Sequence, residues 1–99
     1  MNGWHIRSAL PDSEPNPSNL HDYLNPQLIG GASADARFVF DAVYAPERGH
    51  FVLTLMQIDD EWGFVAHESR LYPRSRAELA AHIRRFCADP AAQWAMADG

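Results

Sequence analysis

The sequence has one cysteine, no lysine and no long apolar run. With Cys87 alone, no intramolecular disulfide can form and a cysteine-based zinc site is excluded. No stretch approaches the roughly 18 apolar residues of a membrane span, and the first residues lack the apolar core of a signal peptide. These absences predict a soluble, unprocessed protein of a reducing, cytoplasmic compartment.

Negative charge prevails, with 13 acidic against 8 basic residues, a formal net charge of -5 and a pI near 5.3. Every basic residue is arginine, which we attribute to a GC-rich coding sequence. A chain of this charge is not expected to hold a long stretch of nucleic-acid backbone. The positive charge is concentrated between residues 70 and 85, at Arg70, Arg74, Arg76, Arg84 and Arg85. We therefore expect a bipolar molecule.

Residues 37–68 alternate apolar and polar side chains in three runs, which predicts an antiparallel β-meander. Residues 46–49 form a four-residue turn, in which Pro46 presets the backbone and Gly49 supplies a positive φ. We expect Asp59 and Asp60 to form a two-residue loop before the third run. Under this register one face of the sheet carries Phe38, Phe40, Tyr44, Phe51, Leu53, Leu55, Trp62 and Phe64.

A helix is predicted over residues 75–87, behind the capping-box spacing of Ser75 and Glu78. We expect its apolar stripe to cover the aromatic face of the sheet. The stripe consists of Leu79, Ala80, Ile83, Phe86 and Cys87. A short terminal helix is predicted over residues 90–97, because Asp89 and Pro90 suit its cap and first position.

Residues 1–36 are loop-rich. Residues 4–7 alternate and can form a short edge strand, Asn16 can cap a short helix that carries Tyr23, and residues 30–34 resemble a flexible connection. The whole sequence predicts a single α+β domain over residues 1–99. Its architecture is a three- to four-stranded antiparallel sheet packed against one main C-terminal helix, with short accessory helices.

No motif points to catalysis, a metal or a cofactor. The histidines show none of the spacings that place two imidazoles on one face of an element. Asp41, Val52 and His67 are expected to lie across three neighbouring strands, with roughly 10 Å between Asp41 and His67, which is too far for a hydrogen-bonded pair. Cys87 falls in the helix stripe, where a thiol is an inert apolar group. We expect no enzyme, and Asp41 and His67 are the only candidates for that alternative.

The expected second face of the sheet is too apolar to be left fully in water. It holds Val39, Val43, Val52, Met56, Ile58 and Val65, with Asp41, Thr54 and His67 between them. The favoured cover is the N-terminal segment, through Leu20, Tyr23, Leu24, Leu28 and Ile29. The alternative is a homodimer or another partner protein.

Two charged segments are candidate partner-binding surfaces. The acidic one comprises Asp59, Asp60 and Glu61, with Glu47 contributing from the other hairpin turn; the basic one comprises Arg70, Arg74 and Arg76. These features favour a small acidic protein-binding module. We expect a stoichiometric inhibitor of a basic, nucleic-acid-handling partner, by class analogy with bacteriophage and mobile-element inhibitors such as anti-CRISPR proteins. The alternatives are an immunity protein that caps a toxin and a homodimeric accessory protein.

Overall fold

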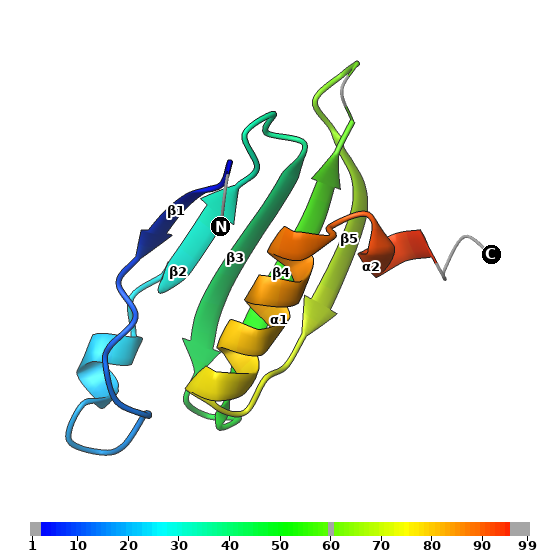
Figure 1. Cartoon of the computed structure of the whole chain (residues 1–99). Helices are drawn as coiled ribbons and strands as arrows, with labels where there is room; N and C mark the ends of the chain where they lie inside the picture. The colour runs from blue at the N-terminus through cyan, green and yellow to red at the C-terminus, as the bar shows by residue number, and fades with distance from the viewer. Residues whose placement is uncertain (1–2, 60, 96–99) are drawn as a thin grey trace.

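The computed structural model describes residues 3–59 and 61–95 and consists of an antiparallel sheet with a helix on one face (Figure 1). The strands are β1 (His5–Ser8), β2 (Ile29–Ala32), β3 (Phe38–Ala45), β4 (His50–Ile58) and β5 (Val65–Leu71), and they lie side by side in chain order. The helices are the 3-10 helix η1 (Leu20–Tyr23), α1 (Arg76–Ala88) and α2 (Ala92–Ala95). The α+β class is confirmed, but the sheet has five strands instead of three to four.

The additional strand is β2, where the sequence suggested a flexible connection. Gly31 lies between Ile6 on β1 and Phe40 on β3. A Cβ atom at Gly31 would lie 2.8 Å from a ring carbon of Phe40 and 3.0 Å from Cγ1 of Ile6, so only glycine lets these side chains pack across the strand. Packing therefore requires glycine at this position of β2, although glycine has a low propensity for strands. The predicted edge strand at residues 4–7 is present as β1.

The first hairpin is confirmed. Ala45 pairs with His50 across a four-residue turn in which Gly49 has a φ of 70°. Phe40 lies opposite Leu55, and Tyr44 lies opposite Phe51, as the matching of apolar faces predicts.

The predicted two-residue loop of the second hairpin is wrong. Ile58 pairs with Val65, so the loop spans residues 59–64, and Gly63 provides its left-handed position with a φ of 75°. Trp62 and Phe64 belong to this loop, where they are 70% and 71% exposed instead of buried in the core. Gln57 lies opposite His67, where a two-residue loop would have placed Trp62. This change of register by an odd number of residues turns β5 over.

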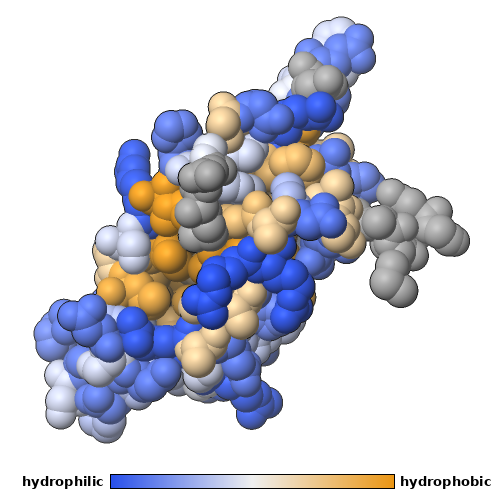
Figure 2. Space-filling model, in the orientation of Figure 1, coloured by the Kyte–Doolittle hydropathy of each residue, from blue (hydrophilic) through white to orange (hydrophobic). Residues whose placement is uncertain are grey.

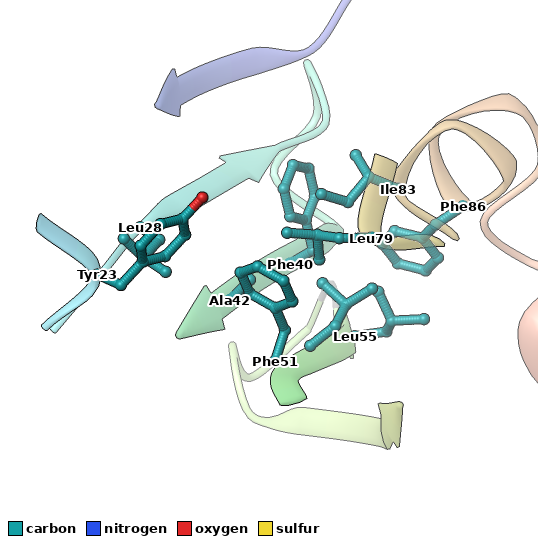
Figure 3. Close-up of a cluster of buried hydrophobic side chains, with 10 residues drawn as sticks. Tyr23, Leu28, Phe40, Ala42, Phe51, Leu55, Leu79, Ile83 and Phe86 are labelled. Carbon is teal, nitrogen blue, oxygen red and sulfur yellow. The ribbon is translucent and has the colours of Figure 1, made fainter. Parts of the chain in front are cut away.

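The main helix confirms the prediction with small shifts. Ser75 caps α1, and its hydroxyl accepts a hydrogen bond from the Glu78 N–H at 3.1 Å. The Glu78 carboxylate accepts from the Arg74 N–H at 2.8 Å, one residue before the cap amide that a capping box predicts. Leu79, Ile83 and Phe86 are buried against the sheet (Figure 3). Helix α2 is shorter than the predicted 90–97, of which residues 96 and 97 lie outside the described residues.

The N-terminal segment packs on the same side of the sheet as α1, so its predicted position over the second face is wrong. Tyr23 and Leu28 are fully buried in the core cluster. The Tyr23 ring lies 5.5 Å from the Tyr44 ring and 6.0 Å from the Phe51 ring. Helix η1 begins at Leu20, later than a cap at Asn16 predicts.

The opposite side of the sheet, here called the open face, remains accessible. On β3 and β4 none of its side chains is buried, whereas Phe40, Leu53 and Leu55 on the helix-covered side are. The open face consists of Val39, Asp41, Val43, Val52, Thr54, Met56 and Ile58, flanked by Val65, Glu68, Arg70 and Tyr72 of the β5 side. The N-terminal segment does not remove this apolar surface from water.

One side chain that agrees with the prediction, Leu79, and one that departs from it, Phe64, provide a test of the packing. We predict that Leu79→Ala lowers the free energy of unfolding by about 2–5 kcal/mol, because Leu79 is fully buried. Phe64→Ala should change it by less than about 0.5 kcal/mol, because Phe64 lies in an exposed loop. Urea denaturation measures both variants. Equal losses would contradict the observed second hairpin.

Candidate functional site

The loop between β4 and β5, here called the tip, extends beyond the body of the protein (Figure 1). It comprises residues 59–64, of which Asp60 lies outside the described residues. Hydrogen bonds order its backbone: the Gly63 N–H donates to the Asp59 carbonyl at 3.0 Å, and the Glu61 N–H donates to the Asp59 carboxylate at 3.0 Å. The Asp59 N–H donates to the Phe64 carbonyl at 2.7 Å and closes the loop.

This arrangement places two large aromatic rings beside carboxylates on a narrow projection. Trp62 and Phe64 are the most exposed of the large apolar side chains described. Tryptophan is enriched among the residues that dominate binding energy in protein interfaces, and surrounding charges steer association. The sequence pointed to Asp59, Asp60 and Glu61 but not to the two aromatic residues. Gly63 was the available signal, because a glycine between two aromatics favours a turn.

A basic hollow lies at the other end of β4, on the open face. It encloses about 710 Å³ and is lined by Ala45, Glu47, Arg48, His50, Val52, Arg70, Tyr72 and Arg74. The His50 and Tyr72 rings meet edge to face at 5.2 Å. The hollow therefore joins Glu47, Arg70 and Arg74, which the sequence assigned to two different surfaces. Glu47 therefore lies at one end of β4 and the acidic tip lies at the other.

Arg76 lies away from this hollow, at the N-terminus of α1. Its backbone N–H donates to both carboxylate oxygens of Glu14, at 3.0 and 3.1 Å. Glu14 thus places a negative charge at the positive end of the helix dipole. Close by, burial raises the pKa of Tyr23, and the Glu14 carboxylate raises it further while Arg76 opposes the shift. Arg76 is a structural residue of the core side, so the predicted group of three arginines is divided.

The predicted arrangement of Asp41, Val52 and His67 is wrong. Asp41 lies opposite Thr54, and His67 lies opposite Gln57 on the helix-covered side because β5 is turned over. Asp41 and His67 therefore project from different faces of the sheet. No acid–base pair is formed by these two residues.

Asp41 instead borders a hollow of about 420 Å³ that Arg7, Gln27 and Gly30 also line. Among the residues described, its Oδ1 atom is buried and has no hydrogen-bond partner. An unsatisfied buried oxygen opposes folding.

Cys87 is half-buried on α1, and burial raises the pKa of its thiol. A raised pKa lowers the thiolate fraction at neutral pH and so the nucleophilicity of the sulfur. Within residues 3–59 and 61–95, no group of three His, Cys, Asp or Glu side chains is placed to hold a metal ion. None of the described helices is long and apolar enough to cross a membrane.

An apolar hollow of about 200 Å³ lies between α1 and the N-terminal strands. It is lined by Leu10, Ile29, Leu79, Ala80, Ile83 and Arg84. Figure 2 shows apolar surface in this area, beside the helix. The lining of this hollow has few polar atoms, so it offers little to orient a ligand by hydrogen bonds.

Asp41 allows a test of whether the open face has a chemical role at this position. We predict that Asp41→Val raises the free energy of unfolding by about 1 kcal/mol, because it removes an unpaired buried oxygen and adds a β-branched residue to a strand. Thr54→Val, opposite on β4, is the matched control. Thermal and urea denaturation measure both. A clear loss of stability in Asp41→Val would show that the carboxylate has a favourable partner.

Comparisons of the chain with protein-family models, with curated proteins and with solved structures found no match. The function is therefore inferred from the tip, the basic hollow and the open face.

Proposed function

We propose that the protein is a binding module that inserts its tip into a basic surface of a partner protein and acts as a stoichiometric inhibitor. The observation that carries the proposal is the exposure of Trp62 and Phe64 beside Asp59 and Glu61 on a projecting, hydrogen-bonded loop. Large rings in water are unfavourable for an isolated protein. In a complex the rings of Trp62 and Phe64 are buried against the partner and contribute to its binding.

The conformation of the tip favours tight binding. Its three internal hydrogen bonds and Gly63 hold the loop before any partner arrives. A preorganised loop loses little conformational entropy on association, so more of the contact energy appears as affinity. Tryptophan and phenylalanine also bury a large area with few rotatable bonds.

The charge of the tip selects the kind of partner. Residues 59–64 contain three carboxylates and no basic side chain, and the whole chain has a net charge of -5. Complementary basic grooves are common where proteins hold nucleic-acid phosphates. Carboxylates of the tip would occupy phosphate positions there, while the rings of Trp62 and Phe64 take the place of stacked bases. A nucleic-acid-handling protein is therefore the partner class that suits the tip.

Two kinds of tip variant separate steering from anchoring. Once the partner is isolated with the tagged protein from cells of its source, Asp59→Lys with Glu61→Lys should slow association and reduce its dependence on salt. Trp62→Ala should mainly speed dissociation and weaken binding by about 2 kcal/mol or more. Surface plasmon resonance at several salt concentrations measures both effects.

Glu47→Lys is the control, because it reverses a carboxylate in the same way, at one position instead of two, at the opposite end of β4. It should leave the association rate close to that of the unmodified protein. Inhibition is measured separately, as loss of nucleic-acid binding by the partner at one equivalent of protein. If neither the lysine nor the alanine variants alter partner binding, the tip is not the contact.

A further inference from the structure

Strand β5 is an outer strand of the sheet, and its pairing with β4 is regular over residues 67–71. The Phe51 N–H donates to the Pro73 carbonyl at 2.8 Å, which sets the hydrogen-bonding phase of this edge. Because hydrogen-bonded pairs alternate in an antiparallel ladder, Leu71 and Ser69 direct their backbone groups toward β4. The backbone groups of the residues between them therefore point outward.

Glu68 and Arg70 are the residues with outward backbone groups. In the part of the chain that the structure describes, no hydrogen bond from another segment reaches these groups. Their side chains both lie on the open face, where they form an ion pair at 3.3 Å. The two side chains are 42% and 61% exposed, and an ion pair in that setting contributes little stability. Both are therefore free to exchange partners.

We propose that β5 binds β5 of a second copy of the chain, antiparallel, with the two-fold axis at Ser69. In this register Glu68 of each copy lies directly opposite Arg70 of the other. Each such position is a hydrogen-bonded pair, so the backbone groups of both residues also find partners. Two cross-strand ion pairs and one ladder of hydrogen bonds then form together.

The charges select this register over its neighbours. Moving the axis to residue 68 places two glutamates opposite each other, and moving it to residue 70 places two arginines opposite each other. Like charges directly opposite are destabilising, so the sequence Glu-Ser-Arg admits one antiparallel pairing and opposes the next two. The other edge of the sheet, β1, has four residues and offers no such pattern.

The arrangement leaves the tips accessible. Because the paired strands run in opposite directions, the two tips point to opposite ends of the dimer. The open faces of both copies become one continuous surface. Binding of a partner to the tip and pairing along β5 are therefore independent, and the failure of one does not decide the other.

Charge reversal tests the pairing in solution. Sedimentation velocity should show a concentration-dependent dimer of the full chain. Glu68→Arg and Arg70→Glu, each alone, should raise the dimer dissociation constant by roughly tenfold or more, because each puts like charges opposite each other. The double variant with both changes should restore dimers, and so should mixing the two single variants. Arg84→Glu on α1 makes the same charge change away from the edge and should have no effect.

A disulfide tests the register. At the axis the two Ser69 residues form a non-hydrogen-bonded pair with a Cα separation of about 4.5 Å, which suits a disulfide. In a Cys87→Ser background, Ser69→Cys should form a covalent dimer on mild oxidation. His67→Cys, on the same side of the same strand, should not, because the two copies of residue 67 lie roughly 13 Å apart along the strand.

Several outcomes would overturn the proposal. A protein that stays monomeric at all concentrations has no such interface. Dimers that ignore both charge reversals, or that cross-link equally through residues 67 and 69, use another surface. If the single variants are unfolded by circular dichroism, Ser69→Cys decides, and its failure to cross-link contradicts the pairing.

Discussion

One helix cannot cover this sheet, and most features of the molecule follow from that constraint. Helix α1 has 13 residues and is therefore about 20 Å long and about 10 Å wide, whereas five strands span about 24 Å. The helix packs against β4 at the centre of the sheet, where Leu79 and Ile83 belong to the same buried cluster as Leu53 and Leu55. The N-terminal segment fills one flank of the same side. In the described part of the chain no further helix covers the opposite side, so its apolar side chains stay in contact with water.

The elements that the sequence predicts well are those with local determinants. The β3–β4 hairpin has a proline–glycine turn between strands of matching alternation, and α1 has a cap at Ser75. Strand β2 and the tip depend instead on glycines whose role is set by packing and loop geometry and not by local sequence pattern. Gly31 is required by the ring of Phe40 on the neighbouring strand, and Gly63 fixes a loop length that alternation alone does not determine. One wrong loop length was enough to place Trp62 and Phe64 in the core and His67 on the wrong side of the sheet.

The candidate surfaces show the same division. The acidic residues of the tip could be recognised from their consecutive positions, and Glu61 lies where it was expected. The aromatic residues beside them could not, because alternation gives an exposed ring and a buried ring the same pattern. Arg70 and Arg74 share a hollow with Glu47, but Arg76 enters the first turn of α1 and meets Glu14. These three arginines are close in the sequence. Helix α1 begins at Arg76, however, so the chain carries Arg76 away from the hollow that Arg70 and Arg74 line.

The hydrogen bonds from Arg76 to Glu14 span 62 positions of the chain, and they bear on the order in which the protein folds. The sheet follows an up-and-down path, so each strand pairs with its chain neighbour at low loop-closure cost. The meander and α1 can form from such contacts alone. The first turn of α1 acquires the Glu14 carboxylate only when the N-terminal segment docks. We therefore expect that segment to open and close without global unfolding, and native-state hydrogen exchange would show the Arg76 amide exchanging faster than the Leu79 amide.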